Sequence, residues 1–379
     1  MSEWKKVKFL DVVSLNPRIS LEKGVEYPFV EMSNAVPGAR KPEKDVYQKY
    51  SGGGAKFEEG DTVVARIEPC LQNGKGFQCP YKKGFGSTEF LVFRPMNLRE
   101  MDYNFLYYYM GQQSIREAMA KTMVGASGRQ RVNNSVFNDL LINLSPLNIQ
   151  QEIATILSRY DSLIENYQKQ IKLLEEAAQR LYKEWFVDLR FPGHENTKIV
   201  NGLPEGWEKK KVGELISKTN RTKQIPSNCY QTQGSIPIID QSRNYIAGYT
   251  DDWESLINVT IPYIVFGDHT RILKYIPFSF AKGADGTQLI MSNDLYRMPQ
   301  TLFYNSLVNI DLSNYSYARH FKYLKEEYIL VPPREIAISY DGVVTRNYHK
   351  ILNNREQIRL LTEARNRLLP KLMSGEMKV

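Results

Sequence analysis

The chain has 379 residues, enough for about two ordinary domains, and its 42% hydrophobic and 24% charged content is that of a globular protein. No apolar run approaches the ~18–20 residues that span a bilayer, the first residues lack a secretory signal pattern, and three cysteines and four scattered histidines are too few for a disulfide framework or a zinc site. We therefore expect a soluble, cytoplasmic protein whose net charge of +8 permits a polyanionic partner.

Residues 1–148 are predicted to form a mixed α and β domain. Runs at 62–65 and 89–93 have the composition of short strands and lie among Gly- and Asn-rich turns. Residues 105–122 have the pattern of one helix.

A long helix is predicted over residues 149–190. Its apolar residues keep a spacing of three and four, without Gly or Pro until Pro192: Ile153, Ile156, Tyr160, Leu163, Tyr167, Ile171, Leu174, Leu181 and Trp185. A stripe of about 37 residues corresponds to ~55 Å of helix. A helix packed only on its own domain would not need that length, so packing against a second long helix is the favoured interpretation.

Residues 191–334 are predicted to form a second mixed domain, with a strand at 261–266, and residues 335–379 a second long helix. Asp341-Gly342 lies where the first copy has helix, which predicts a frayed or late start. Pro370 predicts a kink near the end of this helix.

The two halves repeat one plan. Residues 170–182 and 357–369 match at eight of 13 positions with an offset of 187, and the same offset holds without a gap from Ile142 to Leu181. Upstream the offset changes: Glu3-Trp4 resembles Gly206-Trp207, and residues 59–61 resemble 266–268, a Gly-Asp turn in both. The repeat implies that the two helices run antiparallel. The helix seam is assigned to equivalent apolar positions: Ile171, Leu174, Leu181, Ile358, Leu361 and Leu368.

Four loops carry side chains suited to base edges, of which Arg, Gln and Asn can bind bidentately. They are residues 71–78, 125–134, 268–271 and 318–321. In the two loops of the first half these side chains lie on a Gly-containing backbone, and the two loops of the second half carry Arg and His. Each could instead be a solvated surface turn, but four such loops in two copies favour base readout. The candidate DNA-binding residues are Arg66, Asn73, Lys75, Arg129, Gln130 and Arg131 in the first domain, and His269, Arg271, Arg319 and His320 in the second.

The catalytic motifs of a nucleic-acid enzyme are not recognisable. The sequence has no GxxxxGK[ST] phosphate loop, no Gly-rich loop in a βα context, and no Ser/His/Asp or Cys/His set. Residues 331–334, VPPR, lack the preceding Asp or Asn and the following aromatic residue of an amino-methyltransferase motif, so they are interpreted as a rigid exit into the helix. The carboxylate pairs at 58–59 and 251–252 are interpreted as solvated turns.

The chain resembles, along its whole length, the specificity (S) subunit of type I restriction–modification systems. The features that carry the resemblance are Trp4 and its counterpart in 203–207, the Pro exits at 144–147 and 331–333, the helix ends at 181–188 and 368–376, and the stretches 264–271 and 280–286. The family's Pro exit is usually followed by a Gln-containing helix start, which residues 150–152 fit and residues 335–338 do not.

The resemblance implies an α+β fold with two mixed α/β target recognition domains, separated by two long antiparallel coiled-coil helices, in a pseudo-two-fold repeat. The chain would be a non-catalytic DNA reader, each recognition domain binding one half of a bipartite, asymmetric target while the helices set the spacing. Its partners would be double-stranded DNA, two modification subunits and restriction subunits. S-adenosylmethionine, ATP and Mg²⁺ would be bound by those subunits and not by this chain.

Two other functions stay open from the sequence. A coiled-coil protein–protein scaffold would use the helices without direct base readout. A stand-alone DNA adenine methyltransferase would need the cofactor and catalytic motifs that are not recognisable here.

Overall fold

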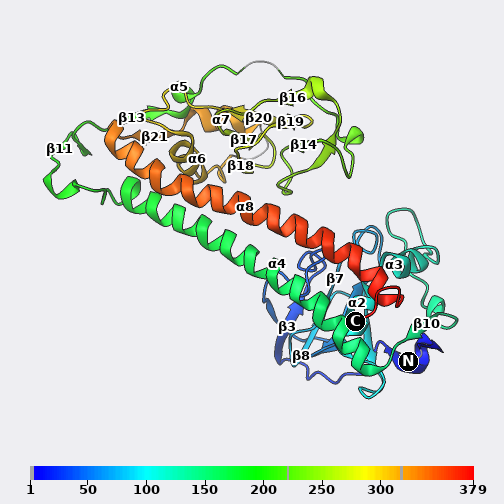
Figure 1. Ribbon diagram of the computed structural model, residues 1–379. Coiled ribbons are helices and arrows are strands. Elements are labelled where there is room, and N and C mark those ends of the chain that lie inside the picture. Colours follow the sequence, from blue (N-terminus) through cyan, green and yellow to red (C-terminus); the bar gives the residue numbers. More distant parts are fainter. Residues whose placement is uncertain (1–3, 220–221, 316–318) are drawn as a thin grey trace. The chain divides into compact units, whose positions relative to one another are not determined.

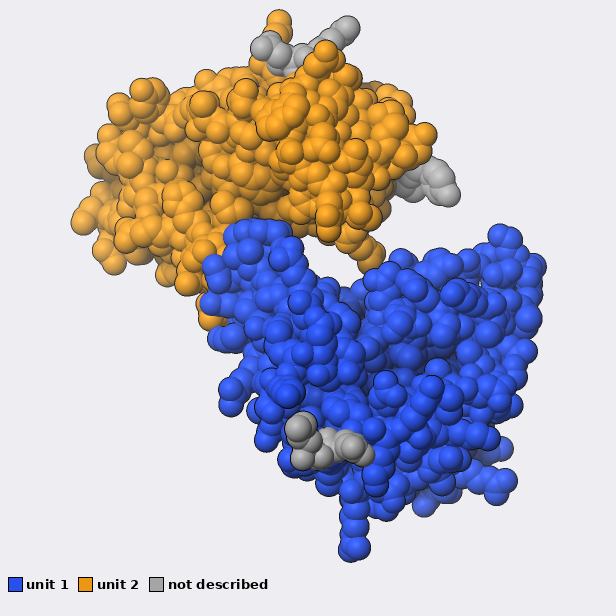
Figure 2. Space-filling model, turned by 45° about the vertical axis from the view of Figure 1, so that its right-hand side comes forward, with its two compact units in different colours: residues 1–168, 355–379 blue, residues 169–354 orange. Residues whose placement is uncertain are grey.

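A computed structural model describes residues 4–219, 222–315 and 319–379 (Figure 1). The chain divides into two compact units, coloured separately in Figure 2. Unit 1 comprises residues 1–168 and 355–379, and unit 2 comprises residues 169–354. Each unit contains one mixed α and β domain and a segment of both long helices, so neither long helix belongs to a single unit.

The domain of unit 1 contains two four-stranded sheets, of strand order β2-β9-β6-β7 and β4-β3-β8-β5, and a separate β1–β10 pair. Its elements in chain order are β1 (Lys5–Lys8), α1 (Phe9–Val12), β2 (Val13–Leu15), β3 (Glu26–Val30), β4 (Tyr47–Lys49), β5 (Ala55–Glu58), β6 (Thr62–Ala65), β7 (Gly76–Gln78), β8 (Lys83–Gly86), β9 (Phe90–Pro95), α2 (Tyr103–Met110), α3 (Gln113–Ala120) and β10 (Leu141–Leu144). The expected single helix over 105–122 is thus two helices, α2 and α3, with a break at Gly111-Gln112.

The domain of unit 2 contains sheets of strand order β18-β17-β20 and β15-β14-β19-β16, with separate β11–β12 and β13–β21 pairs. Its elements are β11 (Ile199–Val200), β12 (Leu203–Pro204), β13 (Glu208–Lys211), α5 (Val212–Leu215), β14 (Ile236–Ile239), β15 (Gly248–Thr250), β16 (Leu256–Ile257), β17 (Tyr263–Gly267), β18 (Leu273–Ile276), β19 (Phe280–Lys282), β20 (Thr287–Ile290), α6 (Gln300–Val308), α7 (His320–Glu326) and β21 (Tyr328–Val331).

The two domains share their strand topology except at β2, whose place in unit 2 is taken by an isolated bridge of Ile216 with Ser292, and this confirms the internal repeat. In each, one sheet has a parallel central pair, β3 with β8 and β14 with β19, flanked by antiparallel strands. In each, the other sheet has a central strand, β6 or β17, between two antiparallel neighbours. In each, an antiparallel pair, β1 with β10 or β13 with β21, immediately precedes the long helix.

One detail of the predicted repeat is wrong. Gly60-Asp61 directly precedes β6, whereas Gly267-Asp268 forms the end of β17 and the start of the loop that follows it. The two Gly-Asp turns therefore lie at opposite ends of equivalent strands. The similarity of residues 59–61 to residues 266–268 reflects a composition that is common in turns, so it did not indicate which strand positions are equivalent.

The two long helices are α4 (Leu147–Tyr182), which continues into a π-helical turn (Lys183–Val187), and α8 (Arg334–Met373). The frayed or late start predicted for the second helix is wrong, because α8 begins directly after Pro333 and passes through Asp341-Gly342 without a break. The Asp341 carboxylate accepts hydrogen bonds from the hydroxyls of Thr301 (2.5 Å) and Thr345 (3.1 Å). These contacts overcome the low helix propensity of the glycine. Pro370 lies inside α8, which continues to Met373.

Within unit 1 the segments of α4 and α8 pack antiparallel. Ile153 and Leu157 of α4 share a buried apolar cluster with Leu372 near the end of α8. Further along α4, Asp161 forms a buried ion pair with Arg365, at 2.5 Å, and accepts a hydrogen bond from the Tyr108 hydroxyl. Because the partner number falls on α8 as it rises on α4, the helices run in opposite directions, as predicted.

Within unit 2 the helix segments follow the same antiparallel pattern. The Asn354 side-chain amide donates to the Gln170 side chain at 3.2 Å, and the Tyr340 hydroxyl donates to the Ala178 carbonyl at 3.4 Å. Tyr340 is fully buried and packs against the rings of Trp185 and Phe186. Aromatic burial of this extent supplies much of the apolar contact between the helices and the domain of unit 2.

The predicted seam residues are half-buried. Ile171, Leu174 and Leu181 pack against the core of unit 2, and Leu368 packs against the core of unit 1. Ile358 and Leu361 lie in the α8 segment that belongs to unit 1. Among the helices of the described ranges, none combines the length and the apolarity needed to cross a membrane.

The ion pair of Asp161 with Arg365 gives a stability prediction. Arg365→Met leaves a carboxylate of 4% exposure without its cation, which we expect to lower the free energy of unfolding by about 3–5 kcal/mol. Denaturant titration of the purified chain measures the loss. Arg367→Met is the matched control on the same helix, since Arg367 is 77% exposed and its pairing with Glu363 contributes only about 0.3–0.5 kcal/mol. Equal losses in the two variants would contradict the assignment.

Candidate nucleic-acid interface

Two stretches singled out in unit 1 lie side by side, although some 60 residues separate them in sequence. The Arg66 backbone accepts a hydrogen bond from the Val132 amide at 2.9 Å and donates one to the Glu89 carbonyl at 2.8 Å. Ile67 forms a bridge with Arg131, and the Glu68 amide donates to the Gln130 carbonyl. The loops after β6 and β8 and the segment before β10 therefore form one continuous surface.

Arg129 and Arg131 differ in how their charge is used. Arg131 forms a bidentate ion pair with Glu89, whose closest contact is 2.7 Å, and its hydrogen bonds hold the pKa of that carboxyl below its usual range. Arg129 is exposed, two residues away on the same loop. Gln130 is half-buried and its side chain makes one long contact, 3.5 Å to the Gly125 carbonyl. Arg129 and Gln130 are therefore better placed than Arg131 to contact a ligand directly.

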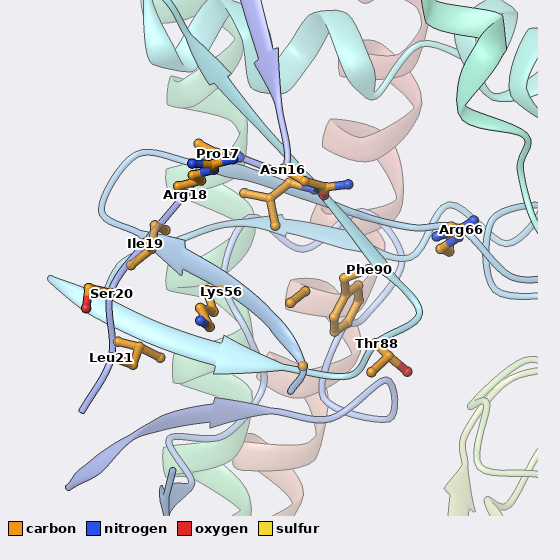
Figure 3. Close-up of a pocket in the computed structure, with 13 residues that line it drawn as sticks. Asn16, Pro17, Arg18, Ile19, Ser20, Leu21, Lys56, Arg66, Thr88 and Phe90 are labelled. Carbon is orange, nitrogen blue, oxygen red and sulfur yellow. Dashed lines mark hydrogen bonds between the residues drawn. The ribbon is translucent and has the colours of Figure 1, made fainter. Parts of the chain in front are cut away.

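Arg66 lines an open cavity of about 750 Å³ at the side of the first domain (Figure 3). Its Nη2 donates to the Val132 carbonyl at 3.2 Å, while its buried Nε has no hydrogen-bond partner. Arg18 and Lys56 line the same cavity on the opposite side from Arg66. Sequence reasoning missed Arg18 and Lys56, because neither lies in an Arg-, Gln- or Asn-rich loop and only the fold brings them near Arg66.

Asn73 and Lys75 lie in the loop between β6 and β7 and line a second cavity of unit 1, of about 560 Å³. Asn73 is exposed. Lys75 is half-buried, and its ammonium donates to the Met32 carbonyl at 2.9 Å.

In unit 2 one glutamine joins the three loops that follow β14, β17 and β19. The Gln241 side chain donates to the Asp285 carbonyl at 2.8 Å and accepts from the His269 amide at 3.1 Å, and its backbone carbonyl accepts from the Thr270 hydroxyl at 2.7 Å. Gly286 has φ +82°, and a Cβ there would lie 2.7 Å from both Gln241 and His269. The positive φ favours glycine at this position, and the hydrogen bonds of Gln241 join the three loops into one platform. Gln241 was also missed, because it has no neighbouring motif.

His269 and Arg271 project from this platform. His269 is exposed, and so is Arg271, whose φ of +61° turns the chain and whose guanidinium donates to the Leu312 carbonyl at 2.9 Å. Arg319 is exposed at the start of α7. Ala318 of the same predicted loop lies outside the described residues.

His320 is placed differently from the other candidates. Only 5% of its surface is exposed, and its Nδ1 lies 3.1 Å from the Asp268 carbonyl. The Asp268 carboxylate in turn accepts from the Phe321 amide at 2.8 Å. His320 therefore connects the start of α7 to the loop after β17 and supports the exposed side chains around it.

The carboxylate pairs have structural partners. Glu58 forms an ion pair with Arg94 at 2.5 Å. A backbone hydrogen bond from Ser235 lowers the pKa of Asp251, and a side-chain hydrogen bond from Lys223 lowers that of Asp252. Across the described parts of the chain, no three His, Cys, Asp or Glu side chains gather as metal ligands would.

Comparisons with known proteins agree with this arrangement. Residues 1–176 match the family described as the type I restriction modification DNA specificity domain. The type I restriction enzyme MjaIX specificity subunit of Methanocaldococcus jannaschii is 27% identical over 302 residues, which cover 73% of this chain and 69% of the relative. The EcoEI specificity subunit of Escherichia coli is 25% identical over 211 residues, or 54% of this chain and 34% of the relative.

A crystal structure of the type I restriction–modification S subunit from M. genitalium has the same fold. It superposes with a TM-score of 0.58 at 17% identity, covering 98% of this chain and 96% of that one. The domain match over residues 1–176, the similarity to specificity subunits over most of the chain and this shared fold together make the chain similar to the specificity subunits of type I restriction–modification systems.

Proposed function

We propose that this protein recognises the target DNA of a type I restriction–modification complex, and that each domain reads one half of a two-part sequence. The observation that carries the proposal is the repeated topology with different loops. The hairpin loop presents Asn73 between β6 and β7 in unit 1 but His269 and Arg271 between β17 and β18 in unit 2. The segment before the last strand presents Arg129 and Gln130 before β10 but Arg319 before β21. Equivalent positions with different side chains suit two different half-sites, and hence an asymmetric target.

The exposed groups on these loops match the chemistry of duplex DNA. Arg and Gln side chains can form paired hydrogen bonds to guanine and adenine edges in the major groove. Arg18 and Lys56, at the cavity of unit 1, are suited to phosphates, which fix the register of a protein on DNA without reading sequence. The net charge of +8 favours approach to a polyanion in general.

The long helices are proposed to bind the partner subunits and to set the distance between half-sites. An internal repeat presents two equivalent surfaces, which suits two modification subunits, with restriction subunits joining that complex. S-adenosylmethionine, ATP and Mg²⁺ would be bound by those partners. The protein–protein scaffold and the stand-alone methyltransferase are less favoured, since the first gives no role to the paired loops and the second needs motifs that the sequence does not show.

The readout role is tested with Arg129→Ala and Arg271→Ala in the assembled modification complex. Each variant should lose ~1–3 kcal/mol on cognate DNA and relax base preference in one half-site only, a different half for each variant. Binding to oligonucleotides randomised in one half-site measures this. Arg99→Ala, an exposed arginine outside the candidate loops and the long helices, controls for the lost charge. Uniform weakening on all sequences would assign the arginines to phosphates instead.

The purified chain alone is expected to be inactive. It should neither transfer a methyl group from S-adenosylmethionine to DNA nor hydrolyse ATP, because no cofactor motif was recognised in its sequence. Radiolabelled methyl transfer and phosphate release are the measurements, with the reconstituted complex as the positive control. Methylation by the chain alone, at a rate near that of the complex, would revive the methyltransferase alternative.

The helix length is expected to set the gap between the half-sites. Inserting four residues after Gln168 in α4 and four after Asn354 in α8 keeps the two helices in step, since Gln170 and Asn354 contact each other. The insertion adds ~6 Å of helix. The non-specific gap should therefore widen by one or two base pairs of ~3.4 Å each, with both half-sites unchanged.

Profiling of methylated genomic sites before and after the insertion measures the gap. Insertion in α4 alone is the matched control and should impair assembly, because it shifts the two helices out of step. An unchanged gap with full activity would rule out helix length as the determinant of spacing.

A further inference from the structure

Two lysines occupy the same position in the two domains, although the sequence around them is not alike. In unit 1, Val64 pairs with Gly76 on one side and with Leu91 on the other. The next residue of β6, Ala65, donates its amide to the Lys75 carbonyl. Lys75, which directly precedes β7, is therefore the cross-strand partner of Ala65.

The register of unit 2 gives the same arrangement. Ile264 pairs with Tyr275 and with Ile290, and the next residue, Val265, pairs with Lys274. Val64 and Ile264 both face the larger core cluster of their own unit. With Val64 equivalent to Ile264, Lys75 is equivalent to Lys274.

Each ammonium group donates to backbone carbonyls of the equivalent loop in its own domain, the loop after β3 or the loop after β14. Lys75 donates to the carbonyl of Met32, two residues after β3 ends. Lys274 donates to the carbonyls of Asp240 (2.7 Å) and Asn244 (2.5 Å), in the loop that follows β14. Its ammonium also lies 3.7 Å from the Asp240 carboxylate. Because β3 and β14 are the equivalent strands of the two parallel pairs, each lysine ties its hairpin to the equivalent loop.

This contact uses a property of lysine that a neutral side chain lacks. An ammonium has three donors on a long stem and can satisfy several carbonyl oxygens of irregular backbone at once. Lys274 is only 4% exposed, so its charge is kept in place by these oxygens and it cannot reach DNA by itself. Its removal would leave the carbonyls of Asp240 and Asn244 without this donor.

In unit 2 the anchored loop leads directly to the exposed candidates. Gln241 follows Asp240 in the chain and fixes the His269 amide and the Asp285 carbonyl. Movement of the loop at Asp240 would therefore displace the platform that carries His269.

We propose that Lys75 and Lys274 are equivalent positioning residues, which determine half-site specificity by fixing the loops after β3 and β14 and not by contacting bases. This inference rests on the proposed function. It predicts that either lysine can be replaced without loss of the other domain's readout.

The test uses the complete chain in its modification complex, with Lys75→Met and Lys274→Met, which keep the length of the stem and remove the donors. Base preference is measured by methylation of DNA libraries randomised in one half-site at a time. Each variant should reduce discrimination in its own half-site by at least about fivefold, the lower end for one base contact, and leave the other half-site unchanged. Lys82→Met and Lys198→Met, at exposed positions in the two units, control for the lost charge.

Two further measurements separate positioning from general stability. Hydrogen exchange should rise in residues 31–46 of Lys75→Met, or 240–247 of Lys274→Met, and stay unchanged in β6, β9, β17 and β20. Lys75→Arg should restore the first half-site, because a guanidinium can also donate to the Met32 carbonyl.

The proposal is overturned if both half-sites keep their preference, if one variant alters both, if exchange rises throughout the unit, or if Lys75→Arg restores nothing. A parent complex that reads no two-part target would refute the proposed function itself, whatever the lysine variants do.

Discussion

The antiparallel packing of α4 against α8 is the contact on which both units depend. Each unit takes one segment from each helix, so its core closes only when residues far apart in sequence meet. In unit 1 this brings Leu372 of α8 onto Ile153 and Leu157 of α4, and in unit 2 it buries Tyr340 among the aromatic residues at the end of α4. Burial of apolar surface supplies the free energy, while the polar contacts fix which residues face each other.

Polar contacts between α4 and α8 occur in both units. Asp161 with Arg365 lies in unit 1, and Gln170 with Asn354 lies in unit 2. An apolar stripe alone allows a helix to slide by a turn at low cost, whereas a buried ion pair out of register leaves a charge without a partner. These pairs therefore set the register of the helices, which the proposed function requires if helix length is to define a distance on DNA.

The spacing of apolar residues and the internal repeat predicted the long helices, which depend on local sequence. The apolar stripe from Ile153 to Trp185 and the gapless repeat at an offset of 187 were sufficient for the long helices and their antiparallel direction. The start of α8 could not be predicted, because Gly342 remains helical through the contacts of Asp341 with Thr301, which lies 40 residues away. Gln241 and Lys274 could not be found either, since their roles appear only once the register of β17 with β18 is known. Composition singled out Arg129 and Arg131 on one loop but could not separate exposed Arg129 from ion-paired Arg131.

The discontinuity of unit 1 has a consequence for biosynthesis. Unit 2 is one uninterrupted stretch, residues 169–354, and all of it is translated before residues 355–379. Domains usually fold in the order in which they are translated. In this chain the second unit can complete its fold before the first. The first 168 residues lack Arg365 and Leu372, which cover Asp161 and the apolar face of α4, until the last segment is made. During that interval the half-finished first unit exposes apolar surface, and a nascent chain stopped before residue 355 would release a complete second unit attached to an open first one.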